Sequence, residues 1–252
     1  MLDSNNFKFK VFEDSRVKER QGFTFGLSGA LLLGTDQQTG KRYIIKHTYA
    51  HNAANEYVAS WLAEKIGVPT PHAELISRAP AFSSRYAVAI EFIDDFTALN
   101  LDTISEGMQK DLIGHLVLAI LIDTDDRIQM SAANGHIYSY DFSEAFYNSD
   151  ELLLNILKIN EDMGYDQIRR KLNGFKERFN YMDFNVPEFA QKYNIDPQKQ
   201  KSYMIDTAKR VLEITEDDIY SMSSELENLY PQPYTVYYEE CIHHIQEFMK
   251  RF

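Results

Sequence analysis

The hydrophobic pattern of the chain changes near Phe96, and this change limits the possible folds more than any other feature of the sequence. Residues 8–50 contain short apolar runs broken by glycines, which predicts strands joined by tight turns. Residues 53–66 instead carry apolar side chains at helical spacing, and two more strands are predicted over 71–78 and 85–93. The part before Phe96 is therefore predicted to be a small antiparallel sheet with one helix.

The predicted helix over 53–66 has recognisable signals at both ends. Asn52 is a suitable N-cap, because an asparagine side chain can accept a hydrogen bond from the free N–H groups of a first helical turn. Gly67, followed by Pro69, is a typical stop signal. We expect the helix to begin after Asn52 and to end before Gly67.

The part after Phe96 is predicted to be mainly helical. The segments with helical character are 107–122, 151–163, 165–179, 199–214 and 235–252. Asn134-Gly135 predicts a tight turn between two short strands, QMSA and HIYSY, and His115 is expected in the core or a cleft. The predicted fold class is α+β with two lobes: a small β-rich lobe with one helix over residues 1–96, and a larger, mainly helical lobe over residues 97–252. Ligands favour clefts between such lobes.

Composition narrows the classes of partner. The net charge is −12, from 26 Lys and Arg against 38 Asp and Glu, and such a negative field repels nucleic acid, which is therefore not expected as a partner. Cys241 is the one cysteine, which suits a reducing cytosol. The N-terminus has no apolar signal-peptide region, and the apolar run over 112–122 is too short to span a bilayer. A cytoplasmic protein without membrane insertion is expected, although a secreted effector is an alternative.

Glycines and one ion pair are the candidate phosphate-binding features of the first lobe. Gly22, Gly26 and Gly29 lie in a turn before a strand, where backbone N–H groups could approach an anion closely. Lys46 lies on the next strand, opposite in orientation to a core-facing Ile45, and a lysine paired with a helical glutamate such as Glu56 binds ATP phosphates in protein kinases. Each feature also has a plain structural explanation: an ordinary hairpin turn, a solvated lysine and an exposed helix charge.

The strand that ends the first lobe is a candidate adenine-binding element. Glu91, Phe92 and Ile93 could offer backbone N–H and C=O groups to an adenine edge. An ordinary connecting strand would have the same sequence pattern, so both interpretations stay open.

Two aspartates flank the predicted hairpin and could perform phosphate chemistry. Phosphoryl transfer needs a carboxylate near the attacking hydroxyl, and oxygen ligands for a metal ion that neutralises charge developing on the phosphate. Asp126 suits the first role and Asp141 the second. Each could equally be an acidic turn residue. The order of glycine-rich turn, lysine, glutamate, linker strand, Asp-Arg and Asp-Phe is harder to explain by structure alone.

This order of motifs resembles the HipA-like serine/threonine kinases, relatives of the protein and phosphoinositide kinases. The similar segments are GLSGALLL, YIIKH, ANEYVASWLAEKIGVPTPHAEL, DDRIQMS and YSYDFSEAF, which fall between residues 22 and 146. The resemblance implies a two-lobed protein-kinase-like fold that binds ATP with Mg²⁺ or Mn²⁺. The helical remainder is compatible with a kinase C-lobe but carries no motif.

The resemblance also implies a role for each matching residue. Lys46 would contact the ATP phosphates, Glu56 would orient it, and Asp126 would be the catalytic base. Asp141 would bind the metal, with Ser131 at the position of a second metal ligand. The remaining positions implied in nucleotide binding are Gly26, Ser28 and Gly29 in the glycine-rich loop, and Glu91, Phe92 and Ile93 at the adenine edge.

The chain departs from the family pattern in three places. Ile128 stands where the family usually has His, and Ser131 where it has a metal-binding Asn, so one metal ligand is weakened or comes from elsewhere. Asn134 follows closely, but its Asn-Gly pair is a turn signal. Gly26 stands where some members have an autophosphorylated serine, which leaves Thr24 and Ser28 as the loop hydroxyls.

We therefore expect phosphoryl transfer from ATP to a protein serine or threonine, including autophosphorylation. The alternatives are a kinase-like binding module without catalysis, or transfer to a small molecule or lipid. The resemblance implies a bacterial protein, either a toxin with an antitoxin partner, an effector with a host partner, or a housekeeping kinase. The sequence does not identify the protein substrate.

Overall fold

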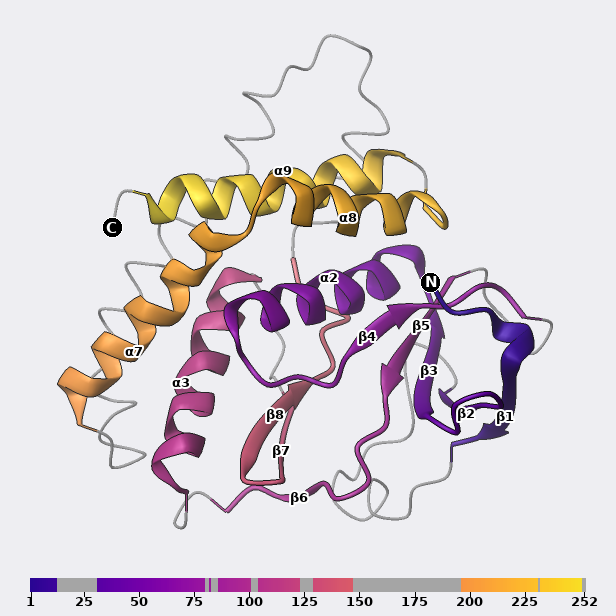
Figure 1. Cartoon of the computed structure of the whole chain (residues 1–252), viewed down its shortest axis with the longest axis horizontal. Coiled ribbons are helices and arrows are strands. Elements are labelled where there is room, and N and C mark those ends of the chain that lie inside the picture. Colours follow the sequence, from indigo (N-terminus) through magenta and orange to yellow (C-terminus); the bar gives the residue numbers. More distant parts are fainter. Residues whose placement is uncertain are drawn as a thin grey trace, which may run out of the picture.

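The computed structural model describes most of the chain on both sides of Phe96. The described residues are 1–12, 31–79, 82, 86–100, 104–122, 129–146, 196–230 and 232–250. Figure 1 shows a sheet beside a group of helices, with a small hairpin between them. The predicted helices over 151–163 and 165–179 lie outside the described residues.

A five-stranded antiparallel sheet, in the order β1-β2-β3-β5-β4, forms the N-terminal part. Its strands are β1 (Phe7–Val11), β2 (Leu31–Asp36), β3 (Arg42–Thr48), β4 (Ala73–Leu75) and β5 (Tyr86–Glu91), and the short 3-10 helix η1 (Ser4–Asn6) precedes them. Side chains alternate along β3: Ile45 is fully buried on one face, and Lys46 projects from the other. The strands predicted over 31–50, 71–78 and 85–93 and the orientation of Lys46 are confirmed, and residues 13–30 lie outside the described residues.

Helix α2 (Ala50–Ile66) lies between the sheet and the C-terminal helices (Figure 1). It is buried on several sides, and its buried residues include the polar Asn52, Asn55, Glu56 and Ser60 as well as apolar ones. The predicted end is confirmed, because Gly67 adopts a left-handed φ of 72°. The predicted start is wrong: Tyr49 is the N-cap, without a side-chain cap bond, and Asn52 lies inside the helix. Its amide is engaged elsewhere, as described below.

A second, three-stranded antiparallel sheet follows. Its strands are β6 (Thr97–Ala98), β7 (Gln129–Ala133) and β8 (His136–Tyr140), in the order β6-β7-β8, and helix α3 (Glu106–Leu121) packs beside them. The predicted turn is confirmed, since Asn134 and Gly135 have φ values of 52° and 80°, the pair of positive angles that a tight hairpin requires. The two-stranded prediction was incomplete, because β6 pairs with β7.

The C-terminal part is helical. Its elements are α7 (Pro197–Lys209), the 3-10 helix η3 (Arg210–Glu213), α8 (Glu216–Glu227) and α9 (Gln232–Met249). The predicted helices over 199–214 and 235–252 are confirmed in outline, whereas α8 was not predicted. No helix among the described residues combines the length and apolar character needed to cross a bilayer.

The main hydrophobic core joins the N-terminal and C-terminal parts. Val58 of α2 and Val88 of β5 belong to the same buried cluster as Leu118 of α3, Leu226 of α8 and Tyr238 of α9. A second, smaller cluster covers the opposite face of the sheet. Because the main core extends across residue 96, the two-lobe division at this residue stays a prediction.

Candidate functional site

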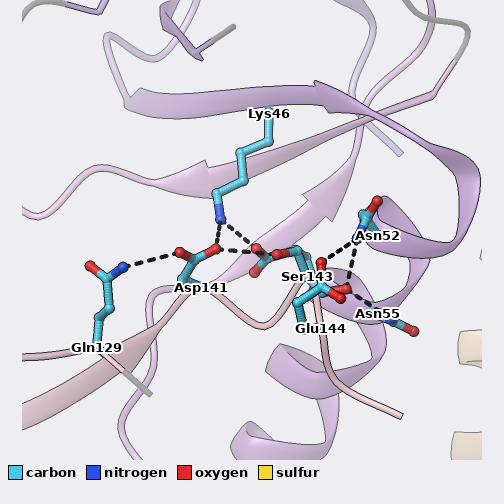
Figure 2. A network of polar contacts seen from close by, with 8 residues as sticks. Lys46, Asn52, Asn55, Gln129, Asp141, Ser143 and Glu144 are labelled. Atoms are coloured by element: carbon cyan, nitrogen blue, oxygen red, sulfur yellow. Dashed lines mark hydrogen bonds and ion pairs between the residues drawn. The ribbon is translucent and has the colours of Figure 1, made fainter. Parts of the chain in front are cut away.

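Lys46 is the centre of a buried polar cluster. Its ammonium forms an ion pair with Glu56 of α2, ten residues later in the chain, and a second one with Asp141, at 2.6 Å between Nζ and Oδ1. Glu56 is 2% exposed, whereas Lys46 is 19% exposed, so the carboxylate of the pair is buried and the ammonium is partly accessible. The structure therefore brings together three of the predicted site residues from β3, from α2 and from the segment after β8. Figure 2 shows the Lys46 ammonium beside the Asp141 carboxylate.

Asp141 directly follows β8 and has an unusual backbone. Its φ of 72° lies in the left-handed region, where a residue with a side chain is strained. Such a conformation persists only when the surrounding structure holds it. Hydrogen bonds surround its carboxylate: Lys46 and Ser143 donate to Oδ1, and Gln129 donates to Oδ2 at 3.2 Å. The strained backbone and these three donors aim the carboxylate at Lys46.

The charges of this cluster set its protonation. Burial would lower the pKa of Lys46, but Glu56 and Asp141 outweigh it, so the pKa lies above its usual value and the lysine stays cationic. Burial raises the pKa of Glu56, only partly offset by Lys46. Burial also raises the pKa of Asp141, but the nearby charge of Lys46 lowers it by more, so this pKa lies below its usual value. Of the two carboxylates, Asp141 is therefore the one that stays ionised at neutral pH.

The base of the hairpin supplies an amide that the sequence did not predict. Gln129, the first residue of β7, lies opposite Tyr140 in the ladder, and its side chain reaches Asp141. Ser131, the predicted second ligand, lies opposite Tyr138, and its hydroxyl is 3.2 Å from the Tyr140 hydroxyl. The hairpin register, once known, identifies Gln129 as the polar side chain beside Asp141.

Two buried asparagines of α2 hold the segment that follows Asp141. Asn52 and Asn55 both donate to the backbone carbonyl of Ser143 at 2.9 Å, and Asn52 also donates to Glu144 at 3.2 Å. Figure 2 shows them on the opposite side of Asp141 from Gln129. The helix that positions Lys46 through Glu56 thus also anchors the chain next to Asp141.

The predicted adenine edge lies at the end of β5. The N–H groups of Glu91 and Phe92 are already bonded, to the carbonyls of His72 and Arg42 respectively. An adenine contact through this strand would therefore use the Glu91 carbonyl and the Ile93 N–H, rather than the Phe92 N–H. This role stays a prediction for all three residues.

An apolar surface lies beside Lys46 on the same face of the sheet. Leu31 is paired opposite Lys46, and Leu33 is paired opposite Ile44, so all four side chains share one face. The three apolar residues are half-buried. Such a surface next to a cation suits a ligand with a flat apolar ring and a phosphate group.

Four predicted site residues lie outside the described residues. They are Gly26, Ser28, Gly29 and Asp126. Their roles in phosphate binding and as catalytic base stay predictions.

Asp141 is the described residue that could contribute a carboxylate to a metal site. Among the described residues, no three His, Cys, Asp or Glu side chains are grouped as a metal site. Mg²⁺ typically takes one or two carboxylates and completes its shell with phosphate oxygens and water. The carboxylate of Asp141 and the side-chain amide of Gln129 beside it are oxygen groups of that kind.

The fold is similar to one solved kinase structure over nearly its whole length. The crystal structure of the Helicobacter pylori proinflammatory kinase CtkA matches with a TM-score of 0.57, covering 98% of this chain and 95% of that chain. This chain has a protein-kinase-like fold. The sequence identity is 12%, so the likeness shows the fold and leaves the chemistry to be argued from the residues. No protein-family model and no curated protein matches the chain.

Proposed function

We propose that this protein is a phosphotransferase that uses ATP with Mg²⁺ or Mn²⁺ to phosphorylate a protein serine or threonine. The observation that carries the proposal is the Lys46 ammonium, held between Glu56 and Asp141 inside a kinase-like fold. Glu56 is buried, whereas Lys46 and Asp141 are 19% and 33% exposed. Burying a charged carboxylate is costly, so a cluster of this kind contributes little to stability and is better explained by function. Membership of the HipA-like family is part of the proposal and is supported by the order of the motifs.

Each residue of the cluster has a chemical task in this proposal. Lys46 binds phosphate oxygens, and Glu56 fixes the position of its ammonium. Asp141, ionised at neutral pH, binds the metal ion, and the Gln129 amide beside it can add a neutral oxygen ligand. Asp126 accepts the proton of the attacking hydroxyl. ATP supplies the phosphoryl group, and the metal neutralises charge that develops on it.

The proposal is tested by intact-mass spectrometry of the purified protein and a generic protein substrate. The sample is incubated with ATP and Mg²⁺, then with ATP and Mn²⁺. Wild type should gain about 80 Da per transferred phosphate or add it to the substrate, and Asp141→Ala should not, because a loss of 10²-fold or more is typical when a group that stabilises the transition state is removed. Asp206→Ala, an exposed acid on α7, is the matched control and should behave like wild type.

Two results would overturn the proposal. Transfer that persists in Asp141→Ala would show that this cluster does not perform the chemistry. No transfer by wild type with either metal would instead favour a kinase-like binding module, and thermal stabilisation by ATP would then test nucleotide binding. Transfer to a lipid or small molecule but not to protein would correct the substrate class alone.

A further inference from the structure

Helix α9 is joined to helix α2 near the site by the hydroxyl of Tyr238. Tyr238 is fully buried, and its OH donates to Oδ1 of Asn55 at 2.6 Å. The amide of Asn55 donates in turn to the Ser143 carbonyl. One continuous path of hydrogen bonds therefore runs from α9, through α2, to the residue two positions after Asp141.

The Tyr238 hydroxyl determines which way the Asn55 amide points. An asparagine amide has one oxygen and one NH₂ group, and only the NH₂ group can donate to a carbonyl. Because Tyr238 donates its single proton to the oxygen, the NH₂ group is directed at Ser143. Without that hydroxyl, the amide of Asn55 loses the partner that fixes its orientation.

The other end of the same segment also packs against Tyr238. The rings of Phe146 and Tyr238 meet edge to face, with centroids 5.3 Å apart. Phe146 itself has a positive φ of 55°, as Asp141 does with 72°. The segment from Asp141 to Phe146 thus has a strained residue at each end. Tyr238 contacts Phe146 directly and is linked through Asn55 to Ser143, two residues after Asp141.

We propose that Tyr238 and Asn55 are positioning residues that hold the Asp141 carboxylate in the geometry needed for metal binding and phosphoryl transfer. This inference rests on the proposed function. It makes α9 a contributor to activity, although no residue of α9 is placed at the reacting atoms. The simpler explanation is that the bond only stabilises packing between α9 and α2, and the two explanations predict different results.

The test compares three Tyr→Phe variants that remove one buried or half-buried hydroxyl each. Tyr238→Phe breaks the path to Ser143. Tyr57→Phe breaks a different bond between α2 and the C-terminal helices, from its OH to Glu225 at 3.2 Å. Tyr230→Phe removes a buried hydroxyl that has no partner among the described residues. Circular dichroism first confirms that each variant is folded at the assay temperature.

Two quantities are measured for each variant: the rate of phosphoryl transfer at saturating ATP, and the affinity for Mn²⁺ by electron paramagnetic resonance. Tyr238→Phe should lower both about tenfold, the effect typical of losing a group that orients a metal ligand. It should leave the KM for ATP within about twofold, because Lys46 keeps its partner Glu56. Tyr57→Phe and Tyr230→Phe should stay within about twofold of wild type in both quantities. Asn55→Ala should lower the rate and the Mn²⁺ affinity about as much as Tyr238→Phe does. The double variant should lose no more than the more impaired single variant, because both residues act along one path.

The outcomes separate this inference from the proposed function. If wild type transfers phosphate and Tyr238→Phe behaves like the two control variants, the positioning role is wrong. If Tyr57→Phe loses as much as Tyr238→Phe, the effect follows packing rather than the path to Ser143, and the inference also fails. If wild type binds Mn²⁺ but transfers no phosphate, the proposed function fails, while a selective tenfold loss of Mn²⁺ affinity in Tyr238→Phe still supports the positioning role. A wild type that neither transfers phosphate nor binds Mn²⁺ overturns both.

Discussion

Replacing Gly67 by alanine tests how strongly the C-terminal part of the chain holds helix α2. Gly67 ends α2 with a φ of 72°, and the Arg210 guanidinium from η3 donates to the carbonyl of Ile66 at 2.9 Å. A Cβ added at Gly67 would overlap that guanidinium. Gly40 is the matched control, because it has nearly the same φ, 73°, and a Cβ there would meet no atom within 4 Å.

The expected losses follow from these two environments. A left-handed backbone costs an alanine about 1–2 kcal/mol, and the smaller freedom of the unfolded chain returns about 0.4–1 kcal/mol, so Gly40→Ala should destabilise by about 1 kcal/mol. At Gly67 the flexible Arg210 side chain can move aside, but it then loses its bond to Ile66. A bond from a charged donor contributes about 1.5–3 kcal/mol, with the lower end suited to the exposed Arg210. Gly67→Ala should therefore cost about 1.5 kcal/mol more than Gly40→Ala.

Urea unfolding measures this difference directly. Trp61, the one tryptophan of the chain, lies on α2 and reports its unfolding by fluorescence. A difference of about 1.5 kcal/mol corresponds to a Tm lower by roughly 3–6 °C in a protein of this size. In an Arg210→Ala background, Gly67→Ala should cost no more than Gly40→Ala, because the displaced bond is already gone. Equal losses for Gly67→Ala and Gly40→Ala in the wild-type background would refute the reasoning.

Three further predictions concern the site and its surroundings. Burial lowers the pKa of His115 to about 4, so the unfolded chain takes up a proton at a higher pH than the folded protein does. The free energy of unfolding should therefore fall by about 3 kcal/mol from pH 6.5 to pH 4. Urea unfolding of His115→Gln should show a smaller fall. Gln129→Ala should slow phosphoryl transfer about tenfold and raise the Mg²⁺ concentration needed for half-maximal rate. Ser131→Ala should change the rate and this Mg²⁺ concentration by less than about threefold. Assays with radiolabelled ATP measure both quantities. Lys46→Met leaves Glu56 buried without its cation, so the pKa of Glu56 rises further and the folded state binds an extra proton. The Tm of the variant should therefore approach that of wild type as the pH falls from 8 to 5. A difference in Tm that stays constant over this pH range would contradict the prediction.

Local patterns explain why much of the fold could be predicted from the sequence. Strand alternation predicted that Lys46 and Ile45 lie on opposite faces of the sheet, and the Asn134-Gly135 pair predicted the hairpin turn. Both signals act within a few residues. The start of α2 could not be predicted in the same way, since Tyr49 caps the helix without a side-chain bond. Asn52 was predicted to be the N-cap because asparagine is common at that position. In the structure its amide instead bonds to Ser143 and Glu144, which are distant in the sequence.

Helix α8 was predictable in principle. Thr215 and Asp218 form a capping box, in which each side chain bonds the backbone N–H of the other. The spacing of these two residues was a usable start signal, and it was missed because the helix that follows is short and mixes apolar with acidic residues.

The contacts of the site depended on information that no short segment contains. Which residue of β7 faces Asp141 is decided by the hairpin register, so Ser131 was chosen from the motif while Gln129 holds the position beside the carboxylate. The bond between Asn55 and Tyr238 joins residues 183 positions apart, and no periodicity links them. Pairing of Lys46 with Glu56 was predictable because strand and helix are adjacent in the chain.

The bond between Asn55 and Tyr238 also has a consequence for the timing of synthesis. A ribosome adds about 5–20 residues each second, so the 183 residues between these two partners take about 10–40 s to translate. Lys46 is synthesised before this interval, and Glu56 and Asp141 are synthesised during it. Until the interval ends, the chain lacks Tyr238, the α9 residue whose hydroxyl bonds to Asn55. A nascent chain would therefore carry an incompletely assembled Asn55–Tyr238 contact until Tyr238 has been added and α9 has packed against α2.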